Sequence, residues 1–207
     1  MSKHSTPLIA ITLLLAAILL AACGPQATPT AAPPTEVPPT AVPPTPEAAI
    51  GSPEHPIKVL FVPSVDAQVI VAGGDVMADA LNEATGLYFQ VSVPTSYAAT
   101  IEEMCASPAD TMAFIPGLGY VLANQLCGVD VSFKAVRFGF DVYWAQILVP
   151  RDSEVDSIED LNGLKWAYPD AGSTSGYMVP LVMFQEAGVT PGETVEAGSH
   201  NAAALAV

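Results

Sequence analysis

Positively charged residues are scarce in this chain. It has 6 Lys and Arg against 21 Asp and Glu, which gives a formal net charge of −15 over 207 residues. Nucleic-acid phosphates are bound by clustered Lys and Arg, and adhesion to anionic lipid needs the same side chains. The composition therefore argues against nucleic acid as a partner and against adhesion to anionic lipid. It does not exclude a small anion, because backbone N–H groups and hydroxyls bind anions without a formal charge.

Long apolar runs are also few, and the most extended one lies close to the amino terminus. Residues 7–20 are almost wholly apolar, follow Lys3, and lead into Leu20-Ala21-Ala22-Cys23. This run is short for a membrane-spanning helix, which needs about 20 residues, and the pattern is typical of a secretory signal. Leu-Ala-Ala-Cys resembles the lipobox of bacterial lipoproteins. The resemblance implies a cleaved signal over 1–23, a lipid on Cys23 and a location outside the cytoplasmic membrane; the alternative is an ordinary signal with a chance cysteine.

Proline, by contrast, is abundant directly after the predicted signal. Residues 25–49 repeat Pro, Thr and Ala in units such as Pro-Pro-Thr. Proline withholds backbone donors and the other apolar groups are small, so this stretch cannot build a packed element. We expect 24–56 to be an extended, semi-rigid spacer, with His55 solvated at its edge. Removal of 1–23 would leave five Lys and Arg against 21 Asp and Glu, a net charge of −16.

Cysteine is scarce as well. Besides Cys23, the chain has only Cys105 and Cys127. An even number outside the cytoplasm favours a disulfide, and each residue ends a predicted helix that flanks the same predicted strand. Two buried thiols are the alternative. The spacing does not fit a zinc site, and we predict neither a metal nor a cofactor.

Beyond the spacer, strand-like and helix-like stretches alternate. This alternation predicts an α/β fold with largely parallel sheets. We expect Asp66 to open a helical stretch that breaks at Gly73-Gly74, and Asp75 to cap a second stretch that ends at Gly86. The strands are expected at 57–63, 87–94, 111–115, 131–138, 142–149, 164–168 and 194–197, and the later helices at 97–104, 118–126, 157–161, 176–187 and after 198.

Two long consecutive strands, at 131–138 and 142–149, interrupt the alternation. They suggest that the chain crosses from one lobe into another. We therefore divide the domain into a first α/β lobe over 57–149 and a partial second α/β lobe over 150–207.

The strongest local motif is Asp170-Ala171-Gly172-Ser173-Thr174-Ser175-Gly176-Tyr177, between a predicted strand and a predicted helix. The first N–H groups of a helix lack partners and carry partial positive charge, so this turn can bind an anion. We expect Gly172 and Gly176 to let a ligand approach the backbone. The alternative is simple helix capping by Ser173 or Ser175. A nucleophile elbow needs serine at the centre of Gly-x-Ser-x-Gly. Thr174 holds the central position of Gly172-Ser173-Thr174-Ser175-Gly176, so this segment is not a nucleophile elbow.

Four collinear segments resemble the phosphate/phosphite/phosphonate-binding proteins of ABC transporters. The first two are Tyr97 to Met104 and Phe114 to Ala123, although Pro116-Gly117-Leu118-Gly119 departs from the family pattern. The third runs from Ile158-Glu159-Asp160-Leu161-Asn162-Gly163 through Gly172-Ser173-Thr174-Ser175-Gly176 to Pro180, and the fourth is Gly198-Ser199-His200-Asn201. The resemblance covers about 57–207. It implies a two-lobed periplasmic-binding-protein fold of type II with an incomplete second lobe, because family members continue beyond the point that corresponds to Val207.

The resemblance also implies a ligand site between the lobes. Tyr97 would bind the oxyanion from the first lobe, and a hydroxyl run with one imidazole would bind it from the second. Tyr143 falls near a second ligand-facing tyrosine of the family, although the local match is loose. The implied ligand residues are Tyr97, Tyr143, Ser173, Thr174, Ser175 and His200.

We predict a binding module without catalytic residues. It would capture phosphonate, phosphite or phosphate outside the cytoplasmic membrane, with an ABC permease as its partner and a lipid anchor in the membrane. Two alternatives stay open: a sensory lipoprotein that reports occupancy to a receptor, and a surface hydrolase that uses Ser173 or Ser175 with His200.

Overall fold

The parallel strands of the structure follow the apolar runs of the sequence. The structure is a computed structural model that describes residues 48–207. Cys23, the rest of the predicted signal and the predicted spacer up to residue 47 lie outside the described residues. The elements of what we call the first lobe (residues 57–127) are β1 (Ile57–Phe61), α2 (Ala67–Thr85), β2 (Phe89–Ser92), α3 (Tyr97–Ala106), β3 (Thr111–Phe114) and α4 (Gly117–Cys127).

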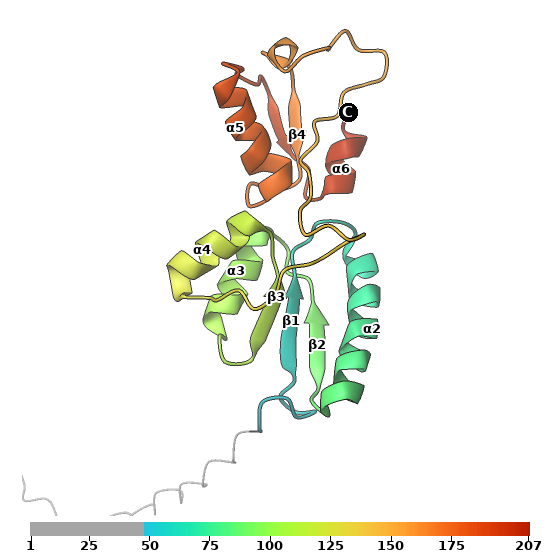
Figure 1. Cartoon of the computed structure of the whole chain (residues 1–207), viewed down its shortest axis with the longest axis vertical. Helices are drawn as coiled ribbons and strands as arrows, with labels where there is room; N and C mark the ends of the chain where they lie inside the picture. Colours follow the sequence, from blue (N-terminus) through green and yellow to red (C-terminus); the bar gives the residue numbers. More distant parts are fainter. Residues whose placement is uncertain (1–47) are drawn as a thin grey trace, which may run out of the picture. The chain divides into compact units, whose positions relative to one another are not determined.

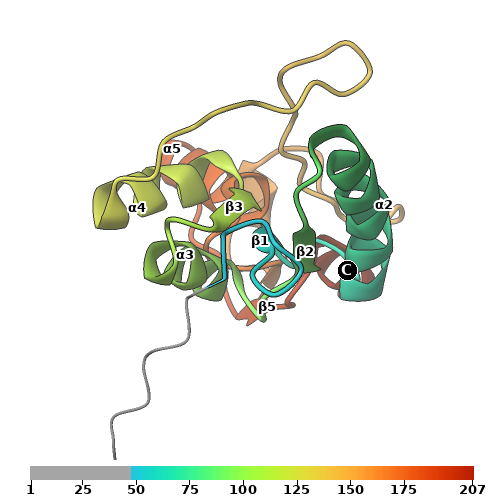
Figure 2. The same ribbon diagram turned by 90° about the horizontal axis from the view of Figure 1, so that it is seen from below.

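The first lobe is a three-stranded parallel sheet between helices. Its strand order is β2-β1-β3, and Val59 of β1 pairs with Val91 on one side and Met112 on the other. Helix α2 lies on one side of the sheet and α3 and α4 on the other (Figure 1, Figure 2). Val59 and Leu60 are fully buried because β1 is the central strand and helices cover both of its faces.

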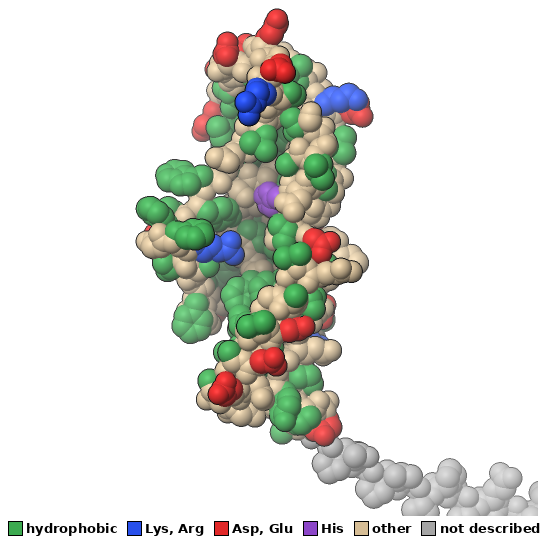
Figure 3. All heavy atoms as spheres, turned by 90° about the vertical axis from the view of Figure 1, so that its right-hand side faces the viewer, with side chains coloured by type: hydrophobic (Ala, Val, Ile, Leu, Met, Phe, Trp, Pro, Cys, Tyr) green, Lys and Arg blue, Asp and Glu red, His purple; other side chains and the backbone are tan. Residues whose placement is uncertain are grey.

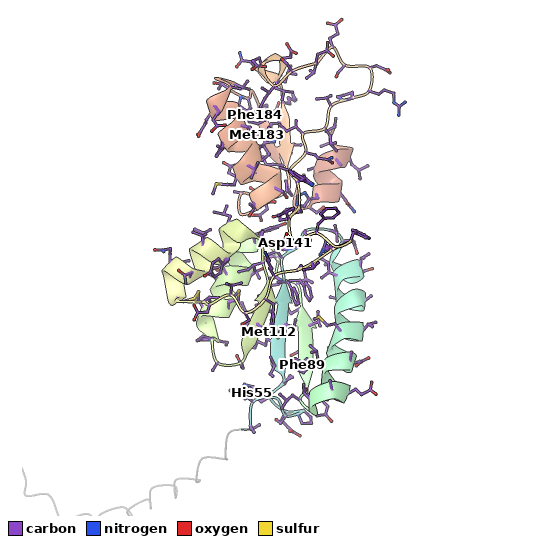
Figure 4. All side chains as sticks on the ribbon, in the orientation of Figure 1. His55, Phe89, Met112, Asp141, Met183 and Phe184 are labelled. Carbon is purple, nitrogen blue, oxygen red and sulfur yellow. A yellow bond between two sulfur atoms is a disulfide. The ribbon has the colours of Figure 1, made fainter. Side chains whose placement is uncertain are left out.

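The second lobe (residues 159–205) holds a two-stranded parallel sheet. Its core is aromatic: Trp166 stacks on Tyr177 with ring centroids 5.2 Å apart and meets Phe184 edge-on at 5.1 Å. Phe184 lies on α5 (Figure 4) and is 2% exposed. The elements are η1 (Glu159–Leu161), β4 (Trp166–Tyr168), η2 (Thr174–Met178), α5 (Val179–Glu186), β5 (Thr194–Glu196) and α6 (His200–Leu205).

Helix α2 corrects one expectation. It runs without a break through Gly73 and Gly74, and its N-cap is Asp66, whose carboxylate accepts hydrogen bonds from the N–H groups of Gln68 and Val69. Asp75 therefore lies inside the helix and caps nothing. Gly74 is present for packing: a Cβ there would lie 2.6 Å from Cγ1 of Val91 on the sheet. The end of the helix is as predicted, with Gly86 in the left-handed conformation at φ 74°.

The two long strands expected at 131–138 and 142–149 are the second correction. Within the described residues this stretch forms only one isolated bridge, between Arg137 and Phe140. Phe138 and Gly139 both have positive φ, as a two-residue hairpin turn requires. The apolar composition predicted strands, but a strand needs neighbouring backbone to accept and donate its hydrogen bonds. Many apolar side chains of this stretch are exposed, Phe138 at 99% among them. Figure 3 shows that apolar side chains are plentiful on one face of the molecule as a whole.

His55 is a third correction, because it is not a solvated residue. Its Nε2 lies 2.7 Å from Oδ2 of Asp110 and its Nδ1 lies 3.1 Å from the carbonyl oxygen of Ala48. The hydrogen bond from His55 is the main cause that holds the pKa of Asp110 below its usual value. Figure 4 shows His55 close to the start of β1. The pair fastens the segment that precedes β1 to the loop before β3.

A disulfide joins Cys105 of α3 to Cys127 of α4, with the two Cα atoms 5.6 Å apart. It links the two helices on one face of the first sheet. No helix among residues 48–207 is long and apolar enough to cross a membrane.

Candidate functional site

Polar groups gather where the strands of both lobes end. The helix that follows a parallel strand begins at the carboxyl edge of the sheet, so α3 and α4 present their first N–H groups at the same edge of the first lobe. In the second lobe, η2 follows β4 and α6 follows β5 in the same way. Hydrogen bonds from backbone N–H groups cross between these edges. They run from Tyr97 N to Asp170 Oδ2 at 3.2 Å, from Leu118 N to Thr174 Oγ1 at 2.8 Å and from His200 N to Ser64 O at 3.0 Å.

Thr174 caps a helix of the opposite lobe. The N-cap of α4 is Pro116, whose side chain accepts no hydrogen bond. Leu118 N–H instead donates to the Thr174 hydroxyl, 56 residues further along the chain. A hydroxyl has two acceptor lone pairs and one O–H donor. Thr174 therefore accepts from α4 and still has its own proton available for an anion.

Ser173 serves as the cap that the sequence left open as the alternative to a ligand role. Its side chain accepts from Gly176 N at 3.1 Å, and the residue is 2% exposed. Its Oγ lies 3.4 Å from Nε2 of His200, which superficially resembles a nucleophile beside a base. The Ser173 oxygen already accepts the cap hydrogen bond from Gly176 N, and the residue's position in the chain is that of a helix cap. This arrangement is accounted for by the cap and gives no specific support to Ser173 as a nucleophile.

Tyr97 lies at the first turn of α3 and is 2% exposed. The pKa of Tyr97 is raised above its usual value, mainly because the side chain is buried. The charge of Asp170 also raises this pKa, and a hydrogen bond with Ser173 opposes the rise in part. Tyr97 therefore remains a neutral phenol that takes part in hydrogen bonds. The structure thus brings three of the predicted residues together: Tyr97, Ser173 and His200.

The two glycines of the motif are packed against side chains of this chain. A Cβ on Gly176 would clash with the ring of Pro169 and lie 3.1 Å from Cε1 of His200. A Cβ on Gly172 would lie 2.8 Å from Cβ of Tyr97. We expected these glycines to let a ligand approach the backbone, but protein groups occupy that space.

Burial lowers the pKa of His200, which favours the neutral imidazole.

Two further predicted ligand residues, Ser175 and Tyr143, are less closely tied to this cluster. Ser175 is half-buried in η2. Tyr143 is 62% exposed and lies in the stretch that forms no strand. Among residues 48–207 there is no group of three or more His, Cys, Asp or Glu side chains placed to hold a metal ion.

Three polar groups at this edge were not predicted from the sequence. Asp170 stands in the motif, but its carboxylate bridges the lobes, which the motif alone does not indicate. Leu118 N and Ser64 O are backbone atoms, and a sequence carries no signal for them. A signal for Asp170 did exist, because an acidic residue beside a predicted anion site needs a structural reason to be there.

The chain is similar to known proteins along most of residues 57–207, as the sequence motifs predicted. The family model of the phosphonate ABC transporter periplasmic substrate-binding protein matches residues 59–207. The phosphate-import protein PhnD of Mycolicibacterium smegmatis is 27% identical, over 77% of this chain and 53% of that protein. The names of these proteins describe binding and import rather than catalysis.

Solved structures show the same fold. A binding protein component of an ABC phosphonate transporter from Pseudomonas aeruginosa superposes with a TM-score of 0.62 at 22% identity, over 73% of this chain and 53% of that one. PhnD1 of Prochlorococcus marinus in complex with methylphosphonate gives a TM-score of 0.53 at 17% identity, over 71% of this chain and 57% of that one. The fold is therefore that of the type II periplasmic binding proteins, present in part. The chain spans about half the length of these relatives.

Proposed function

This chain belongs to the family of phosphonate ABC transporter periplasmic substrate-binding proteins, and from that premise we propose that it captures a phosphonate, phosphite or phosphate anion for an ABC importer. The observation that carries the proposal is the hydrogen bond from Leu118 N–H to the Thr174 hydroxyl. It brings a hydroxyl of the second lobe to the amino terminus of a first-lobe helix, where an anion is favoured.

The donors of this site are mostly uncharged. The proposed donors are the hydroxyls of Ser173, Thr174 and Ser175, the Tyr97 phenol and the His200 imidazole, and together they can bind an oxyanion without a Lys or Arg. Ser173 and Thr174 also cap helices of the two lobes. A ligand held in this way gains charge-assisted hydrogen bonds but no full ion pair, which permits release to a permease. The set also accounts for an anion-binding protein whose net charge is −15.

The location belongs to the same proposal. The sequence around Cys23 supports a lipid anchor on the extracytoplasmic face of the cytoplasmic membrane, with the Pro, Thr and Ala repeats as the spacer. A tether of this kind would keep the binding module close to the membrane permease. Tyr143 is part of the proposed ligand set only through the loose match of its segment to the family.

Calorimetric titration with phosphate, phosphite, methylphosphonate and sulfate tests the ligand site. Thr174→Ala removes one charge-assisted hydrogen bond, worth about 1.5–3 kcal/mol. Affinity should therefore fall by about one to two decades, at about 1.4 kcal/mol per decade. Ser175→Asp places a like charge beside the ligand and should weaken binding further.

Thr85→Ala is the matched control. Thr85 also accepts a hydrogen bond from a backbone N–H, that of Leu87, but it does so at the far end of α2. Its loss should leave the affinity unchanged. The proposal fails if the wild-type chain binds none of the four anions, or if Thr174→Ala and Ser175→Asp bind as tightly as it does.

A further inference from the structure

Asp170 is a buried acidic residue in the middle of the candidate anion site. It follows β4 directly and is 8% exposed. Its Oδ2 accepts from Tyr97 N at 3.2 Å and its Oδ1 accepts from Gly172 N at 2.7 Å. A buried carboxylate is costly unless hydrogen bonds compensate it, and here each oxygen has a backbone donor.

The first of these donors belongs to the opposite lobe. Helix α3 has a side-chain cap of its own, because Ser96 accepts from Ala99 N. Tyr97 N–H, one of the helix's unpaired first donors, is left for Asp170, which lies 73 residues away in sequence. The negative carboxylate also suits the partial positive charge at this end of α3. Asp170 is therefore a helix cap supplied across the lobes.

The second donor fixes the loop that carries the ligand hydroxyls. The bond to Gly172 N closes a turn directly before Ser173 and Thr174, and Gly172 packs so closely on Tyr97 that a Cβ would lie 2.8 Å from Tyr97 Cβ. One carboxylate thus sets the position of Tyr97 relative to this loop.

We propose that Asp170 is a positioning residue that holds Tyr97 and the 172–175 loop in binding geometry across the two lobes before any anion arrives. It acts through these groups and does not contact the anion. The effect on affinity rests on the proposed function, whereas the hydrogen bonds themselves can be measured without a ligand.

The carboxylate is specific for this task. Both oxygens accept, and the carboxamide of asparagine offers one acceptor and one donor group. In Asp170→Asn the amide nitrogen would face the N–H of either Tyr97 or Gly172, so one of the two bonds is lost although the shape is retained.

The experiment compares Asp170→Asn with Asp160→Asn in the full chain. Asp160 is the matched control because its carboxylate accepts from the N–H groups of Asp156 and Ser157 within its own segment. Amide hydrogen exchange of Tyr97 and Gly172 is measured by NMR without ligand, and binding of phosphate and methylphosphonate by calorimetry. Asp170→Asn should speed exchange at one or both amides at least about tenfold and weaken binding about tenfold, which corresponds to about 1.4 kcal/mol. Asp160→Asn should change neither measurement.

A second variant keeps the test decisive if Asp170→Asn does not fold. Gly172→Ala should push the turn away from Tyr97 and give the same two effects. Unchanged exchange at both amides in a folded Asp170→Asn protein would overturn the inference, and so would weaker binding without faster exchange. If the wild type binds neither anion while exchange responds as expected, the proposed function fails and the positioning of Tyr97 and the loop by Asp170 stands.

Discussion

At the scale of single residues, a polar side chain of the site can serve as a helix cap and still have capacity for another partner. Ser173 accepts from Gly176 N and lies beside His200. Thr174 accepts from Leu118 N and keeps a donor. The choice between a helix cap and a ligand site is therefore not exclusive, because a hydroxyl can do one with its lone pairs and the other with its proton.

His200 predicts a specific pH dependence of stability. Burial lowers its pKa below the usual 6.5, so the unfolded chain takes up this proton at a higher pH than the folded one. The stability contributed by His200 is thus fully present above about pH 6.5 and is lost as pH falls through the folded pKa. In thermal melts followed from about pH 7.5 to pH 5, His200→Gln should show a smaller loss of Tm than the wild type. Equal losses in both proteins would contradict the lowered pKa.

At the scale of elements, α2 shows why two neighbouring glycines have different roles. Gly73 and Gly74 look alike in the sequence, and together they suggest a break. In the helix, Gly73 has no atom near its missing Cβ, whereas Gly74 faces Val91 and Phe61. The sheet, not the backbone conformation, requires the second glycine.

This difference predicts opposite effects of the same substitution. Gly73→Ala should raise the free energy of unfolding by about 0.5–1 kcal/mol, because alanine loses less backbone entropy in a helix. Gly74→Ala gains the same amount but forces Val91 to move, which costs about 1–3 kcal/mol, so it should be destabilising overall. Urea unfolding of both variants measures this, and a stabilised Gly74→Ala protein would show that the helix and sheet are less closely packed than described.

The disulfide between α3 and α4 is the other feature at this scale. It closes a loop with a sequence separation of 22 residues, and the chain-entropy model gives about 3 kcal/mol for a loop of this size. The Cys105→Ser/Cys127→Ser double variant should lose about that much free energy of unfolding, and reductant should lower the stability of the wild type but not of the variant. Non-reducing peptide mapping of exported protein should find the linked peptide pair. Finding both thiols free in that material would refute the bridge.

At the scale of the whole molecule, two regions lack elements of the two packed lobes among the described residues: the 131–149 stretch and the part of the chain before residue 48. The first has the composition of strands but, within residues 48–207, only one isolated bridge. The second holds the predicted signal, Cys23 and most of the Pro, Thr and Ala repeats, which lie outside the described residues. Neither of these regions is explained by the packing of the lobes.

The proposed lipid anchor on Cys23 can be tested with the whole chain in the cell. Cys23→Ser removes the thiol that would receive the lipid, so the precursor should stay uncleaved or unlipidated. Detergent phase partitioning and the mass of the amino-terminal peptide measure this, and Cys127→Ser is the control that should still partition with detergent. A Cys23→Ser protein that loses its signal and still fractionates with membranes would contradict the lipobox interpretation.

Sequence alone determined the features that depend on local chemistry. Alternation of apolar and helical stretches predicted the parallel α/β fold, and the order of the 57–207 motifs predicted the family, which the family model confirms. Gly86 ended its helix as expected, since only a residue that tolerates positive φ fits there.

The tertiary structure decided what depends on neighbours from distant parts of the chain. Gly74 lies inside an unbroken helix and packs against Val91, and residues 131–149 form no extended strands in the structure, whereas the apolar composition of the stretch had predicted two. The cross-lobe bonds of Asp170 and Thr174 span 73 and 56 residues. No local pattern contains such distances, so the assignment of these two side chains as caps of another lobe's helices came from the fold.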